Sequence, residues 1–306
     1  MKAVITGSQG FVGRHLTTEL SENGYDVHGI DLLRGENAYV VDLLNRDAIK
    51  EYIFEIKPDV IFHLAAQASI PLSWENPQVT FQLNVIGTIN LLEAIRKVRR
   101  TCRLVIIGSA DQYGVTGTSA AISEKYTLNP RNPYAASKKA QEEIAAIYAE
   151  AHLINIFYTR SFNHCGSGQK PGFLVSDLCR GIVQVERGNA QHLKVGNLGA
   201  IRDFTDVRDI VRAYRLIIEK GSSGEIYNIG SGIGRRVQEV LDLLLTMAKC
   251  TICVQSDKER MRISDTPTLV CDNTKIREHT GWVPTIPFEQ TLNDALEYYR
   301  SVSSEV

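Results

Sequence analysis

The glycine-rich stretch TGSQGFVG, residues 6–13, constrains what this chain can fold into more than any other part of its sequence. The apolar run KAVITG leads into it, and FVGRHLTTELSENG leads out of it with the periodicity of an amphipathic helix. Glycines at such a junction let the backbone turn tightly and bring a helix N-terminus close to a phosphate. The spacing is G-x-x-G-x-x-G, but strand and helix flank it as a dinucleotide-binding unit requires. Gly7, Gly10 and Gly13 therefore predict a pyrophosphate site.

Strand and helix patterns alternate along the first half of the chain. Short apolar strands are expected in KAVITG, YDVHGID, AYVVDL, DVIFHLA, RLVIIGSA and INIFYTRSF. Helices are expected at 45–56, where Asn45 is the candidate N-cap, and at 79–98 and 135–152. Strands that are apolar on both faces and alternate with helices indicate an α/β fold with a Rossmann-type, doubly wound parallel sheet.

The pattern changes after residue 165, where CGSGQKPG forms a Gly/Pro-rich loop. Helices become more frequent, and no flexible linker separates the two parts of the chain. We therefore expect residues 1–165 plus about 200–232 to form a dinucleotide-binding domain. A smaller, interleaved C-terminal domain, about 166–199 plus 233–306, is expected to bind the substrate.

Composition and charge exclude several classes of function. The 306 residues carry a formal net charge of -1 and no basic run longer than RKVRR, so no nucleic-acid partner is expected. No apolar run approaches the roughly 20 residues of a membrane span, and the N-terminus has no signal-peptide pattern. The C-x-x-C pair, Cys250 and Cys253, has no second ligand pair, so no metal is expected. These features predict a cytoplasmic protein with free thiols.

Asp31 ends the second expected strand, roughly 20 residues beyond the glycines. A carboxylate at this position typically holds the ribose 2′-hydroxyl, which favours NAD(H). Arg34 lies just beyond it and suits the 2′-phosphate of NADP(H), so both cofactors stay open, with NAD(H) preferred. Asp42, at the end of the third expected strand, either meets the adenine amine or caps the next turn.

Tyr134 and Lys138 form a Y-x-x-x-K pair in NPYAASKKA, and residues four apart share one face of a helix. A lysine ammonium beside a phenol stabilises the phenolate, so the pKa of Tyr134 is expected to fall from about 10 toward neutrality. Such a tyrosine exchanges a proton with a hydroxyl or carbonyl group. Ser109, at the tip of the strand RLVIIGSA, precedes the pair in the chain. The three residues together predict acid–base chemistry beside the dinucleotide.

Six motifs carry a resemblance that covers nearly the whole chain. They are TGSQGFVG (6–13), HLAAQ (63–67), NVIGT (84–88), GSADQYG (108–114), PYAASK (133–138) and RSFNHCGSGQ (160–169). In these motifs the chain resembles the extended short-chain dehydrogenases/reductases. It is most similar to the branch that acts on nucleotide-linked sugars, the GDP-4-keto-6-deoxy-mannose reductases and the related GDP-mannose 4,6-dehydratases.

The resemblance implies a role for each matched residue. Tyr134 would be the general acid or base, Lys138 would bind the nicotinamide ribose and tune Tyr134, and Ser109 would donate to the substrate carbonyl oxygen. The implied cofactor-binding positions are Gly7, Gly10, Phe11, Val12, Gly13, Asp31, Asp42, Leu43, Leu64, Ala65, Ala66, Tyr134 and Lys138. The implied substrate-binding positions are Gln67, Ser109, Asp111, Asn163, Arg202 and Arg262.

The same resemblance implies partners. The substrate would be a nucleotide-sugar, with a GDP-linked one expected, and the arginines would meet its pyrophosphate. Two long helices, residues 80–98 and 135–152, resemble those that form a homodimer interface in this family. Packing on the sheet explains their apolar stripes equally well.

The motif GSADQYG (108–114) bears on whether the chain catalyses reduction or elimination. By the resemblance, a 4,6-dehydratase carries a glutamate where this chain has Asp111, and a small polar or acidic residue where it has Ala110. Ala110 has no proton to give, and Asp111 is one methylene shorter than glutamate. We therefore expect NAD(P)H-dependent reduction of the 4-keto group of a GDP-4-keto-6-deoxy-hexose to a GDP-6-deoxy-hexose such as GDP-D-rhamnose. The alternatives are a nucleotide-sugar 4,6-dehydratase or 4-epimerase with recycled NAD, and a non-catalytic dinucleotide-binding sensor or scaffold.

Overall fold

A computed structural model describes residues 1–35, 38–98, 101–115, 117, 120–257 and 266–302. A seven-stranded sheet has the order β10-β6-β5-β4-β1-β2-β3, and every neighbouring pair is parallel. The strands are β1 (Lys2–Thr6), β2 (Asp26–Asp31), β3 (Ala38–Val40), β4 (Val60–His63), β5 (Arg103–Ser109), β6 (Ile156–Ser161) and β10 (Ile226–Ile229). The order reverses between β1 and β4, as in a doubly wound sheet, so the predicted Rossmann-type fold is confirmed.

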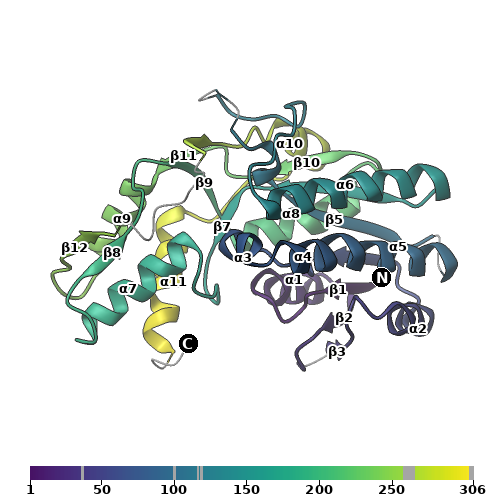
Figure 1. The fold of residues 1–306 in the computed structure, drawn as a ribbon, viewed down its shortest axis with the longest axis horizontal. Helices are drawn as coiled ribbons and strands as arrows, with labels where there is room; N and C mark the ends of the chain where they lie inside the picture. Colours follow the sequence, from purple (N-terminus) through teal and green to yellow (C-terminus); the bar gives the residue numbers. More distant parts are fainter. Residues whose placement is uncertain (36–37, 99–100, 116, 118–119, 258–265, 303–306) are drawn as a thin grey trace.

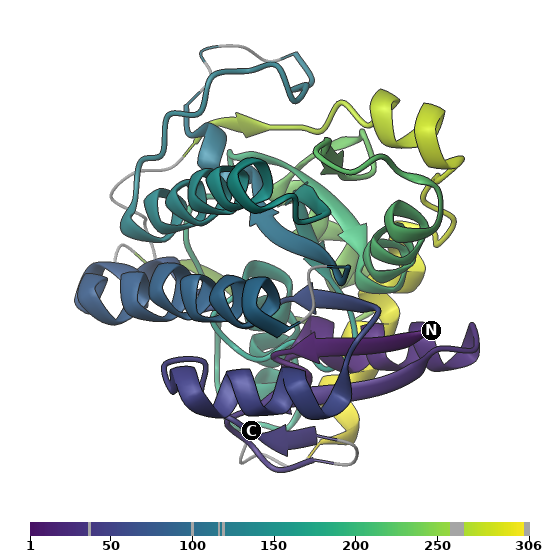
Figure 2. The same cartoon turned by 90° about the vertical axis from the view of Figure 1, so that its right-hand side faces the viewer.

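Helices cover both faces of this sheet. They are α1 (Phe11–Glu22), α8 (Val207–Lys220) and α10 (Thr274–Thr280) on one face, and α2 (Arg46–Ile56), α5 (Gly87–Val98) and α6 (Pro133–His152) on the other. Figure 2 shows the sheet between the blue and teal helices α5 and α6 and the green helix α8. Successive side chains of a strand point to opposite faces, so Ala3 and Ile5 belong to the first core and Val4 to the second. The strands therefore read as continuous apolar runs because both faces are buried.

The helix predicted at 45–56 is confirmed. It begins at Arg46, and Asn45 is its N-cap, as expected. The Asn45 side chain accepts a hydrogen bond from Ala48 N at 3.1 Å, which satisfies one of the first backbone donors of the helix.

The helix predicted at 79–98 is confirmed, but it contains a π-helical turn that was not predicted. The chain stays helical through α4 (Pro77–Phe81), the π-helical turn η1 (Gln82–Ile86) and α5. Asn84 of this wider turn donates to Ser137 Oγ at 2.9 Å and accepts from a loop backbone N–H at 2.8 Å. These tertiary hydrogen bonds hold the irregular turn, and the apolar spacing on either side does not reveal it.

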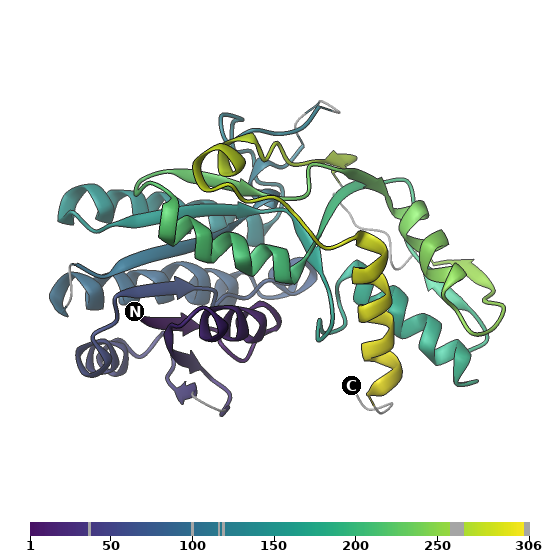
Figure 3. The same cartoon turned by 180° about the vertical axis from the view of Figure 1, so that it is seen from behind.

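The rest of the chain forms a smaller unit at one end of the molecule (Figures 1 and 3). Its strands are β7 (Asn163–Cys165), β8 (Leu193–Val195), β9 (Ile201–Asp206), β11 (Gly234–Arg236), β12 (Val254–Ser256) and β13 (Thr268–Leu269). β9 pairs with β7, β11 and β13, and β8 pairs with β12. Its helices α7 (Leu174–Glu186), α9 (Val237–Thr246) and α11 (Phe288–Ser301) share an apolar core with β8 and β9.

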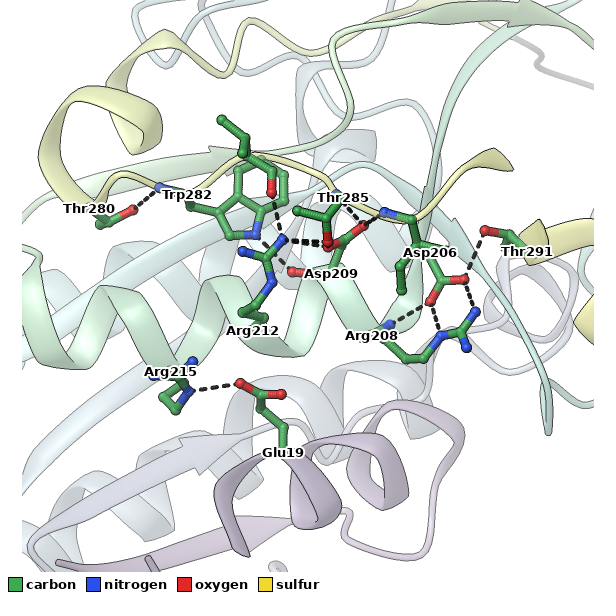
Figure 4. A network of polar contacts seen from close by, with 12 residues as sticks. Glu19, Asp206, Arg208, Asp209, Arg212, Arg215, Thr280, Trp282, Thr285 and Thr291 are labelled. Carbon is green, nitrogen blue, oxygen red and sulfur yellow. Dashed lines mark hydrogen bonds and ion pairs between the residues drawn. The ribbon is translucent and has the colours of Figure 1, made fainter. Parts of the chain in front are cut away.

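The C-terminal segment returns to the seven-stranded sheet before it ends in the smaller unit. Trp282 is fully buried in the core beneath that sheet, and α11 then packs on α7. Two aspartates at the start of α8 hold the crossing, as Figure 4 shows. Asp209 accepts from Thr285 N at 2.9 Å, and Asp206 accepts from Thr291 Oγ1 at 2.8 Å. These contacts hold the smaller unit against the sheet.

Candidate active site

Neighbouring strands end together at the carboxyl edge of the seven-stranded sheet, where the strand order reverses. Gly7 follows β1, Leu64 follows β4 and Ser109 ends β5. Asn163 begins β7, just beyond the end of β6. Residues that are far apart in the sequence therefore meet at one edge, which is where open α/β sheets bind ligands.

The loop after β1 forms a cradle that a side chain would fill. Gly7 has a φ of +74°, and a Cβ at this position would lie 2.9 Å from Ala65 N. A Cβ at Gly13 would lie 2.2 Å from Gly7 O, so α1 approaches the loop this closely only because Gly13 has no side chain. Gly10 is the N-cap of α1 and places no side chain over the first N–H groups of the helix. The cradle fits the pyrophosphate of a dinucleotide.

Asp31, at the end of β2, lies beside this cradle. Its Oδ2 accepts from Gln9 N at 2.9 Å, and its Oδ1 accepts from Leu33 N at 3.0 Å. These backbone donors hold the carboxylate where a ribose hydroxyl would meet it. Asp42 accepts a hydrogen bond from Leu44 N at 2.9 Å, which caps the turn. Turn capping was one of the two roles predicted for Asp42, and the other was a contact with the adenine amine.

The remaining cofactor candidates lie near the same edge. Those at the start of α1 and after β4 are all partly buried: Phe11, Val12, Leu64, Ala65 and Ala66. Ala65 N donates to Thr6 Oγ1 at 3.1 Å, which ties the end of β4 to the end of β1. Leu43 is buried and belongs to the core that β1 shares with α2 and α5.

A local cap places the catalytic candidates of α6. Asn132 is the N-cap of this helix and accepts from Ala135 N at 2.8 Å, while Pro133 occupies the first helical position. Tyr134 therefore lies in the first turn, and Lys138 follows one turn later. Both side chains are buried.

The surroundings of Tyr134 raise its pKa. Burial is the main cause, and the negative charge of Asp111 adds to it. The neighbouring Ser109 side chain acts in the opposite direction. The prediction that Lys138 lowers this pKa is therefore wrong: burial raises it, and Lys138 is not among the groups that shift it. Tyr134 keeps its proton at neutral pH.

Lys138 is held inside the protein. Its Nζ donates to Ile107 O at 2.7 Å and to Gln141 Oε1 at 2.9 Å. Burial lowers the pKa of Lys138 to about 7, so its charge changes near neutral pH.

A line of buried hydrogen bonds runs on from Gln141 toward the glycine cradle. Gln141 Nε2 donates to Thr88 Oγ1 at 2.8 Å, and the Thr88 hydroxyl proton goes to a backbone carbonyl of η1. Thr88 therefore accepts from His63 Nε2 at 2.8 Å, which leaves His63 Nδ1 to accept from Thr6 Oγ1 at 2.8 Å. Burial lowers the pKa of His63 to about 3, so the imidazole stays neutral in this tautomer. The line connects Lys138 to the end of β1.

Replacing Lys138 by methionine tests the lowered pKa. Between pH 7 and 10.5 the unfolded chain protonates Lys138 and the folded chain does not, so the free energy of unfolding of the wild type rises with pH in that window. As the pH rises through this window, the wild type should therefore gain stability relative to Lys138→Met, by up to about 1.4 kcal/mol per pH unit. Urea unfolding at a series of pH values measures it. Parallel pH curves for the two proteins would contradict the prediction.

The predicted substrate residues are distributed over both units. Gln67, after β4, donates from Nε2 to Thr80 Oγ1 at 3.0 Å. Asn163 is exposed at the start of β7, and β7 pairs with β9, which carries Arg202. The register pairs Asn163 with Phe204, two residues after Arg202, so the two candidates lie on adjacent strands of the smaller unit. Arg262 lies outside the described residues.

Three buried polar residues behind Ser109 and Tyr134 were not singled out from the sequence: Gln112, Glu142 and Arg160. Glu142 follows Lys138 by four residues and continues the same face of α6, a spacing that could have indicated it. Ser109 and Gln112 have the S-x-x-Q spacing of a capping box, which could have indicated Gln112. No comparable pattern marks Arg160, because its partners come from distant segments of the chain.

Within the described ranges, no three or more His, Cys, Asp or Glu side chains are grouped so that they could hold a metal ion. Among the same residues, none of the helices combines the length and apolarity needed to cross a membrane. Cys250 and Cys253 are both exposed free thiols.

The doubly wound sheet, the glycine cradle and the Ser109, Tyr134 and Lys138 side chains beside it define an extended short-chain dehydrogenase/reductase. The family described as GDP-mannose 4,6 dehydratase matches residues 4–295, most of the chain. The chain belongs to this family.

Individual relatives are similar over nearly their whole length. The chain is 33% identical over 299 residues to the GDP-6-deoxy-D-mannose reductase of Pseudomonas aeruginosa, covering 97% of this chain and 96% of that protein. The structure of RMD from Pseudomonas aeruginosa complexed with NADPH matches with a TM-score of 0.89 at 31% identity, covering 98% of this chain and 99% of that one. The UDP-glucose 4-epimerase of Thermus thermophilus, in complex with NAD, has a TM-score of 0.90 at 27% identity and 99% and 100% coverage.

Proposed function

We propose that this protein reduces the 4-keto group of a GDP-4-keto-6-deoxy-hexose with NADH or NADPH, giving a GDP-6-deoxy-hexose such as GDP-D-rhamnose. One observation carries the proposal: the Ser109 side chain lies close enough to Tyr134 to affect its pKa, at the strand edge that holds the glycine cradle. The similarity to a GDP-6-deoxy-D-mannose reductase supports the choice of a GDP-linked sugar.

In the proposed reaction, the two hydroxyls act on the carbonyl oxygen at C4 of the sugar. When bound, the reduced nicotinamide supplies a hydride to the carbonyl carbon. Tyr134, whose raised pKa keeps it protonated, gives its proton to the oxygen as negative charge develops there. Ser109 Oγ donates a hydrogen bond to the same oxygen. Lys138, one turn further along α6, adds positive charge near the site when it is protonated.

Two residues beside Ser109 favour reduction over elimination. The buried Ala110 offers only a methyl group, which transfers no proton. The Asp111 carboxylate turns back toward Ser109, with Oδ2 3.5 Å from Ser109 Oγ, and Asp111 N donates to the same hydroxyl at 3.2 Å. Elimination needs a base that reaches the carbon beside the carbonyl, within about 2.6–3.2 Å of its proton. A carboxylate held against Ser109 is poorly placed for that step, whereas hydride transfer needs no such base.

A substrate panel tests the proposal. The protein is incubated with GDP-, UDP- and dTDP-linked 4-keto-6-deoxy sugars, and the absorbance of NADH or NADPH is followed. We expect one mole of reduced cofactor to be consumed per mole of the GDP-linked sugar, with NMR of the product giving the configuration at C4. Conversion of GDP-mannose to the 4-keto sugar by the protein alone would identify a dehydratase instead. Isomerisation without net consumption of cofactor would identify an epimerase.

The position of Asp31 leads us to propose a preference for NADH over NADPH. Its carboxylate, fixed by two backbone donors, suits a ribose hydroxyl and repels a 2′-phosphate. We expect Asp31→Asn to weaken NADH binding and strengthen NADPH binding, changing the ratio of the two Kd values by about 10-fold, or roughly 1.4 kcal/mol. Fluorescence titration of the protein with each cofactor measures both constants, with Asp47→Asn, at an exposed aspartate in the first turn of α2, as the control. An unchanged ratio would contradict the preference.

We also propose a homodimer formed through the helices at 80–98 and 135–152. Exposed apolar side chains on α4, η1 and α6 support it: Val79, Phe81, Ile86 and Ile147. Light scattering coupled to size-exclusion chromatography measures the mass in solution. A cytoplasmic location remains a prediction.

The interleaved domain division likewise remains a prediction, with residues 1–165 plus about 200–232 binding the dinucleotide and about 166–199 plus 233–306 binding the nucleotide-sugar. The separate apolar cores of the two units support it. β9 belongs to the 200–232 part but pairs within the smaller sheet, and α10 belongs to the 233–306 part but packs against the larger sheet. Each part of the chain therefore contributes a segment to the other unit.

A further inference from the structure

We propose that Gln112 is a positioning residue that locks Ser109 against the helix carrying Tyr134 and thereby sets the geometry of the two reacting hydroxyls. The role rests on the proposed function, because the relative position of Ser109 and Tyr134 matters for turnover only if both act on one oxygen. It assigns a task to a buried side chain that neither contacts the substrate carbonyl nor forms part of the glycine cradle.

Gln112 bridges the strand tip and α6. It lies in the 3₁₀ turn η2 (Ala110–Tyr113) directly after β5, and its side chain is fully buried. Its Oε1 accepts from Ser109 N at 2.8 Å, and its Nε2 donates to Glu142 Oε2 at 3.1 Å. A Cβ at Gly108 would lie 2.7 Å from Gln112 Oε1, so the glycine leaves the room that this contact needs.

Glu142 is itself held in place and lies on the catalytic face of α6. Arg160 of β6 donates to both of its carboxylate oxygens, from Nε at 3.0 Å and from Nη2 at 2.5 Å. Tyr134, Lys138 and Glu142 follow one another at four-residue spacing and therefore share one face of the helix. The bridge through Gln112 consequently joins Ser109 to the helix face that carries Tyr134.

A carboxamide is suited to both ends of this bridge. The Ser109 N–H needs an acceptor, and the Glu142 carboxylate needs a donor, so the orientation of the Gln112 amide is determined. Methionine at this position keeps the chain length but leaves both buried groups without that partner. A glutamate would set two carboxylates against each other. A displacement of the order of 1 Å at a reacting group is enough to lower turnover by about 10²-fold.

A double-mutant cycle distinguishes positioning from a general effect on stability. The kcat values of Gln112→Met, Ser109→Ala and the double variant are compared with that of the wild type. We expect Gln112→Met to lower kcat by about 10- to 100-fold while the KM for the reduced cofactor stays within about 2-fold. In the Ser109→Ala background the same substitution should change kcat by less than about 2-fold, because the group that it positions is gone.

Tyr113→Phe is the matched control. The Tyr113 hydroxyl donates to Asn228 Oδ1 at 2.7 Å and accepts from Arg160 Nη1 at 2.9 Å, so its loss removes buried hydrogen bonds from the same 3₁₀ turn without touching Ser109. We expect a lower melting temperature but a kcat within about 2-fold of the wild type. The proposal would be overturned if the kcat losses of Gln112→Met and Ser109→Ala multiply in the double variant. It would also be overturned if Gln112→Met has a normal kcat.

Amide exchange gives a readout that does not depend on activity or on the methionine variant. In Gln112→Asn the carboxamide is one methylene shorter and cannot reach both partners. The exchange rate of the Ser109 N–H, followed by NMR, should rise by about 10-fold or more relative to the wild type. Unchanged protection would overturn the bridge. A wild type that reduces no 4-keto sugar would refute the proposed function instead, and the exchange rate would still decide whether Gln112 holds Ser109.

Discussion

Replacing Tyr134 by phenylalanine is expected to lower turnover by about 10²-fold or more, while the Kd for the reduced cofactor stays within about 2-fold. The phenyl ring fills the same buried position, so the packing of α6 is kept, but no proton reaches the carbonyl oxygen. The raised pKa of Tyr134 makes the protonated phenol the form present at neutral pH, which is the form that reduction consumes. Steady-state oxidation of NADH or NADPH measures turnover, and fluorescence titration measures cofactor binding.

Tyr25→Phe is the control for this substitution. The Tyr25 hydroxyl donates to Glu219 Oε1 at 3.1 Å, and Tyr25 directly precedes β2, at the amino edge of the sheet and away from the strand tips of the site. We expect its kcat to match the wild type. Near-normal turnover in Tyr134→Phe would rule out the phenol as the proton donor. Loss of cofactor binding in the same variant would show instead that the substitution disturbs the cofactor site.

Replacing Arg160 by methionine should lower the free energy of unfolding by about 3–5 kcal/mol. Arg160 and Glu142 form an ion pair in which both side chains are almost completely buried. Removing the guanidinium leaves the Glu142 carboxylate in the protein interior with its charge uncompensated. The cost of keeping this charge away from water makes up most of the loss in stability. Urea unfolding at neutral pH, followed by circular dichroism, measures the change.

An exposed pair on the same helix provides the comparison. Lys139 and Glu143 of α6 are 3.7 Å apart between Nζ and Oε1 and remain accessible to water, so Lys139→Met should change the stability by less than about 1 kcal/mol. The double variant Glu142→Leu with Arg160→Met should recover part of the lost stability, because no buried charge is then left alone. A loss of only about 1 kcal/mol in Arg160→Met would mean that the carboxylate finds another partner or reaches water.

Features that depend on short stretches of chain were predictable. The glycine cradle depends on backbone space at Gly7 and Gly13, and the cap of α2 depends on Asn45 and the residues directly after it. The placement of Tyr134 and Lys138 on one face of α6 follows from helical geometry alone. The π-helical turn η1 within the 79–98 helix was not predictable, because Asn84 is held there by groups from another loop and another helix.

By itself, the sequence determined the parallel α/β architecture, the cradle and the order of the Ser109, Tyr134 and Lys138 side chains along the chain. Each of these follows from periodicity or from the conformational freedom of glycine, which act over a few residues. Only the tertiary structure decided the direction of the Tyr134 pKa and the hydrogen bond from Gln112 to Glu142 of α6. Burial and hydrogen-bond partners are set by segments that meet only after folding, so their electrostatic effects cannot be read from local spacing.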